Sequence, residues 1–195
     1  MSDEAAERVR PSQEEISDEL RRRAHNQRLA RVVLSTIGGM LVVAAAVVLL
    51  VTFFFPTLRI YGNSMESTLA EGEIVISVRS SKYETGDVVA FYYNNKVLVK
   101  RIICGPGDWF NMDEDGNVLV NGTMLEEPYV TERGFGKCDI ELPYQVPEGQ
   151  YFVMGDQRES SVDSRLAQVG CVPLEQTVGR IVLRVWPLDA IGTVS

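Results

Sequence analysis

The chain has 195 residues, 45% of them hydrophobic and 24% charged, and it carries a net charge of −8. This length predicts one principal domain with additional segments, and the negative charge argues against nucleic acid as a partner. The three cysteines, Cys104, Cys138 and Cys171, are too few and too scattered for a disulfide framework or a zinc site. A Cys138–Cys171 bridge stays open as one alternative, with one thiol left over.

The first predicted element is a membrane-spanning helix at residues 32–55. These 24 residues carry no charge, and Pro56 follows them. A helix of this length measures about 36 Å, enough to cross a hydrocarbon core of about 30 Å. The alternative is a cleaved signal peptide, whose apolar core is shorter, about 7–15 residues. We therefore expect an anchor in contact with the lipid bilayer.

Positive charge lies on the N-terminal side of this span. Residues 21–31 contain five arginines and no acidic side chain, whereas Arg59 is the only basic residue between the span and Arg79. Because positively charged flanks stay in the cytoplasm, we expect residues 1–31 to be a cytoplasmic tail and residues 56–195 an extracytoplasmic domain. The polar residues 2–19 predict disorder or a loose helix without a readable function.

Short runs of β-branched and aromatic residues follow the span, with turn pairs such as Asn94-Asn95 and Asp115-Gly116 between them. The predicted strands are residues 73–78, 87–93, 96–103, 117–120, 150–155 and 179–187. The pattern predicts a mainly β fold, an all-β core with a smaller β-hairpin insertion at about residues 105–147. For four aromatic side chains we favour packing in the sheet or a hairpin over contact with lipid: Phe91, Tyr92, Tyr93 and Trp109.

Three hydroxyl side chains, Ser64, Ser67 and Thr68, lie just after the span. A serine nucleophile needs a base that takes its proton. The only histidine, His25, falls on the other side of the predicted membrane. This placement excludes a Ser-His-Asp triad within one chain, and it also excludes metal catalysis through histidine. Carboxylates and lysines are left as candidate bases.

The chain has four lysines, and only Lys100 lies in the middle of a predicted strand, where Leu98 and Ile102 share its face. Burial among apolar side chains lowers the pKa of a lysine, and a neutral lysine can act as a general base. The alternative is that Lys100 reaches solvent or pairs with an acid. Three lysines read as solvated: Lys82, Lys96 and Lys137.

Four blocks in order carry a resemblance to a known family. They are the N-terminal anchor, "GNSMESTL" at 62–69, "KRIICGPGD" at 100–108 and "GDQRESSVDSR" at 155–165. Together they resemble the bacterial type I signal peptidases, which are membrane-anchored Ser-Lys proteases. The resemblance implies an all-β catalytic core with a smaller β insertion, in agreement with the strand pattern.

The resemblance also implies roles for single residues. Ser64 is expected to be the nucleophile, Lys100 the general base, and Ser161 a hydrogen-bond partner of the lysine amine. Asp163 and Arg165 match a pair that supports the site.

The region around the nucleophile matches the family's oxyanion hole and substrate site at Gly62, Asn63 and Met65. Some relatives supply a second oxyanion donor through a serine hydroxyl at the position of Gly62, which has none. The implied substrates are exported preproteins with signal peptides and small residues at positions −1 and −3, cleaved at the outer surface of the cell membrane. No metal or other cofactor is implied, and the oligomeric state stays open.

Three positions depart from the family pattern. Ser67 replaces a proline, Cys104 a glycine and Gln157 an asparagine. These departures keep a second function open, a catalytically weak or silent relative that acts as a membrane-bound binding or scaffold protein. A self-cleaving Ser-Lys protease of the DNA-damage repressor type is the alternative enzyme, and the anchor speaks against it.

Overall fold

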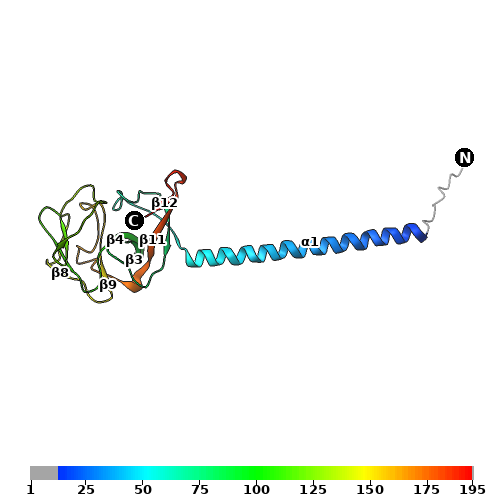
Figure 1. Ribbon diagram of the computed structural model, residues 1–195, viewed down its shortest axis with the longest axis horizontal. Helices are drawn as coiled ribbons and strands as arrows, with labels where there is room; N and C mark the ends of the chain where they lie inside the picture. Colours follow the sequence, from blue (N-terminus) through cyan, green and yellow to red (C-terminus); the bar gives the residue numbers. More distant parts are fainter. Residues whose placement is uncertain (1–12, 195) are drawn as a thin grey trace. The chain divides into compact units, whose positions relative to one another are not determined.

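The computed structural model describes residues 13–194, apart from the side chains of residues 13–16, 18–20, 24–27 and 54. These residues fall into two compact units, divided after Leu50. The first unit is the larger part of one helix, and the second holds all the described strands (Figure 1). The mainly β fold with one N-terminal apolar helix is therefore confirmed.

Helix α1 spans Gln13–Phe54. Its C-terminal half is the uncharged stretch expected to cross a membrane, and it ends just before Pro56, which cannot continue a helix. Among the described residues α1 is the one helix long and apolar enough to cross a membrane, and it fits a membrane anchor. The helix begins well before residue 32, so part of the expected loose tail is helical. Residues 2–12 of that tail lie outside the described part.

The main sheet of the second unit positions the residues of interest. Its strand order is β1-β2-β11-β3-β4-β9-β10, and β12 pairs with β11 outside this order. All its described pairings are antiparallel. The strands are β1 (Thr57–Arg59), β2 (Ile74–Val78), β3 (Val88–Tyr93), β4 (Lys96–Cys104), β9 (Gln150–Met154), β10 (Val172–Pro173), β11 (Thr177–Trp186) and β12 (Gly192–Thr193). Two 3₁₀ turns, η1 (Leu174–Gln176) and η2 (Leu188–Ala190), flank β11.

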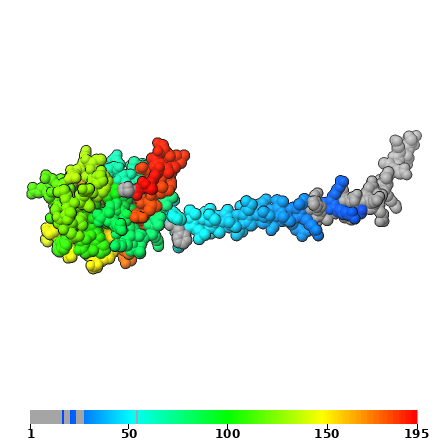
Figure 2. Space-filling model, in the orientation of Figure 1, coloured from blue at the N-terminus to red at the C-terminus, as the bar shows by residue number. Residues whose placement is uncertain are grey.

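A second sheet lies between β4 and β9 in the sequence. Its order is β7-β6-β5-β8, made of β5 (Trp109–Met112), β6 (Val118–Val120), β7 (Thr123–Met124) and β8 (Tyr144–Gln145). Figure 2 shows its residues, coloured green to yellow-green, gathered away from the red C-terminal residues. Phe110 stacks on Phe152 of β9 with ring centroids 4.1 Å apart, which joins the second sheet to the main one.

Consecutive residues of β3, β4 and β9 are buried, in runs of four or five, so both faces of these central strands are covered and contribute to the core. One cluster includes Met65 and Leu69, which are 2% and 0% exposed and lie in the turn that follows β1. A second cluster lies where the two sheets meet and includes Phe110 and Phe152. Because Met65 and Leu69 are buried, they anchor the turn after β1 that carries Ser64.

The expected packing in the sheet or a hairpin is wrong for two of the four aromatic side chains. Tyr92, near the end of β3, and Trp109, at the start of β5, are 58% and 46% exposed, whereas Phe91 is buried as expected. The Cys138–Cys171 bridge, which the sequence left open, is absent, since all three cysteines are free thiols.

Candidate active site

Ser64 lies in a tight turn over residues 63–69 that follows β1. The amide of Glu66 donates to the carbonyl of Asn63, and the amides of Thr68 and Leu69 both donate to the carbonyl of Met65, at 2.8 and 2.6 Å. The buried side chain of Met65 anchors one end, and Ser64 is half-buried. The turn therefore presents the Ser64 hydroxyl from a rigid segment.

Lys100 lies on β4, directly opposite Val89 of β3. Its side chain is 3% exposed, while the other three lysines are exposed, as the strand position predicts. The Lys100 Nζ donates to the Ser64 Oγ at 2.5 Å. The structure thus brings together two side chains that are 36 residues apart in the sequence.

Burial is the main cause that lowers the pKa of Lys100, from 10.5 to about 8. Asp163 raises this pKa, Arg165 lowers it, and Asp156 raises it, in decreasing order of effect. A neutral amine is therefore accessible near neutral pH, and the Ser64 hydroxyl can then donate its proton across the same short contact.

Ser161 lies beside this pair, but its hydroxyl makes no hydrogen bond. Its Oγ is the one buried side-chain polar atom without a partner among the described residues. Gly155 holds it close: a Cβ on Gly155 would collide with the Ser161 hydroxyl and would come within 2.7 Å of the Ser64 carbonyl oxygen. The implied bond from Ser161 to the lysine amine is not formed, although the hydroxyl is free to make it.

Asp163 and Arg165 form the pair that the resemblance implies. Arg165 Nε and Nη2 donate to the two carboxylate oxygens of Asp163, each at 2.9 Å, and both side chains are 0% exposed. Asp163 also accepts the Gly155 amide, and Arg165 donates to the carbonyls of Phe135 and Arg158. The pair therefore ties together the loop that carries Gly155 and Ser161.

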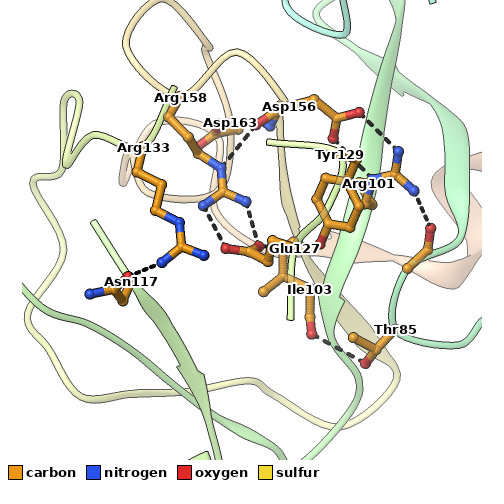
Figure 3. A network of polar contacts seen from close by, with 12 residues as sticks. Thr85, Arg101, Ile103, Asn117, Glu127, Tyr129, Arg133, Asp156, Arg158 and Asp163 are labelled. Atoms are coloured by element: carbon orange, nitrogen blue, oxygen red, sulfur yellow. Dashed lines mark hydrogen bonds and ion pairs between the residues drawn. The ribbon is translucent and has the colours of Figure 1, made fainter. Parts of the chain in front are cut away.

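A second buried ion pair was not expected from the sequence. Arg101, next to Lys100, donates through Nε and Nη2 to Asp156 at 2.9 Å each (Figure 3). Thr68 donates to the same carboxylate at 2.5 Å and accepts from Arg101 at 2.8 Å. The pair joins β4, the Ser64 turn and the 155–165 loop. Arg101 and Asp156 lie in the third and fourth sequence blocks, and this position in the motifs was the signal in the sequence that could have pointed to them.

The region expected to hold the oxyanion is exposed at Gly62 and Asn63 and buried at Met65. Gly62 has a φ of +83°, a conformation that favours glycine. No Cβ would clash at Gly62, so the backbone angle, rather than space, explains the residue.

A groove of about 590 Å³ opens beside the Ser64–Lys100 pair. The end of β1 and the residues after it line one side, and Lys96 to Lys100 of β4 line the other. β1 is an end strand of the sheet, and β4 pairs with β9 only from Arg101 onward. Two strand edges without a described strand partner therefore border the groove, which suits an extended peptide.

The three departures leave this geometry in place. Ser67 is exposed on a turn whose hydrogen bonds are formed, and the Gln157 amide donates to the Ser64 carbonyl at 3.1 Å. Cys104 is fully buried in the core between the sheets, and burial is the main cause that raises the pKa of its thiol to about 12. None of these side chains displaces the Ser64–Lys100 contact.

The family model described as "Signal peptidase, peptidase S26" matches residues 33–186. Thylakoidal processing peptidase 1 of the Arabidopsis thaliana chloroplast is 36% identical over 151 residues, which cover 68% of this chain and 42% of that protein. Signal peptidase IB of Staphylococcus aureus strain Mu50 is 36% identical over 150 residues, 67% of this chain and 77% of that one.

Among solved structures, a signal peptidase I from Enterococcus faecalis V583 aligns with a TM-score of 0.44 and 28% identity. The alignment covers 51% of this chain and 97% of that one. The chain spans less than half the length of the plant relatives that it matches, at 42% and 39%.

Proposed function

The chain belongs to the signal peptidase family, peptidase S26, and on this premise we propose that it is a membrane-anchored serine endopeptidase that removes signal peptides from exported preproteins. The observation that carries the proposal is the 2.5 Å contact between Lys100 Nζ and Ser64 Oγ, on a lysine whose pKa is lowered to about 8. The groove beside this contact would hold the peptide that is cut.

In the proposed reaction the neutral amine of Lys100 takes the proton of the Ser64 hydroxyl while Oγ bonds to the scissile carbonyl carbon. The resulting ammonium then gives its proton to the leaving amine as the C–N bond breaks. A water molecule then bonds to the acyl carbon of the Ser64 ester while Lys100 takes one of its protons. That proton passes to Oγ as the bond between Oγ and the acyl carbon breaks, which releases the peptide with a new C-terminal carboxyl group. The backbone amide of Ser64 is one hydrogen-bond donor to the oxyanion. The oxyanion would form in the region of Gly62, Asn63 and Met65.

Ser161 has a positioning role in this scheme. Its hydroxyl is buried without a partner, and it lies near the Ser64 carbonyl, on the other side of the Gly155 Cβ position. It is therefore free to hydrogen-bond the Lys100 amine, the partner that the resemblance implies. The ion pair of Asp163 and Arg165 holds the loop that carries Ser161. These roles agree with the residues that the resemblance assigns.

The proposed placement in the cell follows from the anchor. Residues 32–55 cross the membrane, residues 1–31 stay in the cytoplasm, and residues 56–195 work outside. The five arginines before the span and the lone Arg59 soon after it support this orientation. Signal peptides emerge at the same membrane surface, so the anchor raises the effective concentration of enzyme near its substrate.

Two point variants test the dyad. We expect Ser64→Ala and Lys100→Met each to lower kcat on a purified preprotein by about 10³-fold or more, because the nucleophile or its base is missing. Lys82→Met is the matched control, since Lys82 is exposed and is not among the residues that line the groove. Cleavage is followed by gel shift of the preprotein, with the full chain in detergent micelles.

The same experiment separates the enzyme from a silent relative. A wild-type chain that leaves the preprotein intact would support a binding or scaffold role instead. Turnover that survives in either dyad variant would rule out this pair as nucleophile and base.

A further inference from the structure

We propose that Glu127 and Tyr129 are positioning residues, which link Arg101 to Arg158 and thereby hold the 155–165 loop against the Ser64–Lys100 pair. This proposal rests on the proposed peptidase function only where activity is measured. Both residues lie in the irregular segment between β7 and β8, within the expected insertion and outside the three motif blocks around Ser64, Lys100 and Ser161.

Glu127 is 5% exposed and forms a forked ion pair with Arg158 of the loop. Arg158 Nη2 donates to Glu127 Oε1 at 2.5 Å, and Arg158 Nη1 donates to Oε2 at 3.1 Å. Figure 3 shows the two groups facing each other. A forked arginine–carboxylate pair is directional, so it sets the position of Arg158 as well as its charge.

Tyr129 connects this pair to the strand that carries the base. Its hydroxyl donates to Glu127 Oε1 at 3.2 Å, and its ring lies 3.8 Å from the Arg101 guanidinium carbon (Figure 3). A guanidinium over an aromatic face is held by attraction to the ring. Arg101 is the neighbour of Lys100, so the chain of contacts runs from β4 through Tyr129 and Glu127 to Arg158.

Arg158 in turn closes the loop from inside. Its Nε donates to the Gly155 carbonyl at 3.3 Å, and its own carbonyl accepts from Arg165 Nη2 at 2.7 Å. Gly155 is the residue whose Cα lies against the Ser161 side chain and the Ser64 carbonyl. A shift of Arg158 would therefore move Gly155 against Ser161 and the Ser64 carbonyl, in the loop whose charges act on Lys100.

The insertion touches the loop at a second place, which supports the same role. The Phe135 carbonyl accepts from Arg165, and the Asp139 amide donates to the Arg165 carbonyl at 3.1 Å. A Cβ on Gly136 would come within 2.5 Å of the Arg158 carbonyl oxygen, so the backbones approach closely there. The insertion thus holds both sides of the loop rather than lying apart from the site.

Glu127→Gln tests the link with the smallest change of shape. The groove residues do not include Glu127, so we expect kcat to fall by about 10- to 100-fold with KM unchanged, as a slight misplacement of reacting groups does. Glu126→Gln is the matched control, because the neighbouring glutamate is exposed. Tyr129→Phe removes only the bond to Glu127, so we expect a smaller loss in the same direction.

A second readout separates positioning from stability. The groups that face Lys100 are Asp163, Arg165 and Asp156, and burial is the main cause of its low pKa. Water admitted by a loosened loop would raise that pKa in Glu127→Gln above its wild-type value of about 8. The titration is followed by ¹³C NMR of the lysine ε carbons in the folded chain, where the other three lysines are exposed.

The outcomes are distinct. A fall in kcat at constant KM with a higher Lys100 midpoint, and wild-type behaviour in Glu126→Gln, supports the proposal. An unmoved midpoint in Glu127→Gln and Tyr129→Phe, with any loss of activity proportional to the unfolded fraction, overturns it. If Glu127→Gln does not fold, Tyr129→Phe decides by the same midpoint. An inactive wild-type chain contradicts the peptidase function, while the NMR titration still tests the positioning.

Discussion

The amine of Lys100 is held in its site at a cost in stability. It is 3% exposed, and burial lowers its pKa from 10.5 to about 8. The unfolded chain therefore binds this proton more tightly than the folded chain does. Between pH 8 and 10.5 the free energy of unfolding rises with pH, and below pH 8 the full cost, about 3 kcal/mol, is present.

Removing the amine is expected to stabilise the protein while it abolishes the activity. Lys100→Met should raise the free energy of unfolding at pH 7 by about 1–3 kcal/mol, and the gain should disappear towards pH 10.5. Denaturant titration at several pH values measures this, with the exposed Lys96→Met as control. A Lys100→Met chain that is less stable at pH 7 would contradict the burial cost.

Position 155 requires a glycine because there is no room for a Cβ atom. Gly155→Ala would push a methyl group into the Ser161 hydroxyl and to 2.7 Å from the Ser64 carbonyl. We expect a loss of activity of about 100-fold or more with the fold retained, because the loop must shift to admit the methyl group. Single-turnover cleavage measures the loss. Gly192→Ala is the control, since nothing lies within 4 Å of its Cβ position and its φ lies outside the left-handed region.

At the scale of elements, long runs of β-branched residues predicted strands well. β3, β4 and β9 match their predicted ranges within one residue at each end. The strands of two residues, such as β8 and β10, were missed because two residues carry no period. Pairing to neighbours, rather than local propensity, makes these residues strands.

The candidate site was predictable where the chemistry is local. The position of Lys100 in a strand among apolar residues allowed for its burial, and the exclusion of His25 left lysines and carboxylates as candidate bases. The links that join separate segments were not predictable. Glu127 and Arg158 are 31 residues apart, and no periodicity relates them, so only the fold brings them together. The same holds for Tyr92, which is exposed although Ala90 on the same face of β3 is buried, because only the fold decides which end of a strand is covered.

At the scale of the whole molecule, the proposed orientation places the two ends of the chain on opposite sides of a membrane. A tag at the N-terminus of the full chain should resist protease added to intact cells that lack a wall, and a tag at the C-terminus should be digested. This follows from the arginines before the span. Digestion of the N-terminal tag with protection of the C-terminal one would reverse the proposed orientation.

The net negative charge is also a property of the whole molecule. The net charge of −8 lies in residues 56–195, because residues 1–31 carry seven acidic and seven arginine side chains. Apart from Lys100, the charged side chains buried near the site are paired, Arg101 with Asp156, Arg158 with Glu127 and Arg165 with Asp163. Breaking any such pair leaves a buried charge unpaired, which costs about 3–5 kcal/mol. The fold and the site therefore depend on the same contacts.

The central claim is that Ser64 is a nucleophile activated by Lys100. The most direct measurement is the rate at which a serine-directed covalent probe labels the full chain between pH 6 and 10, with the labelled residue identified by mass spectrometry. We predict a label on Ser64 alone, a rate that rises with a midpoint near pH 8, and no label in Lys100→Met. A label on Ser67 or Ser161, or equal labelling of Ser64 in Lys100→Met, would contradict it.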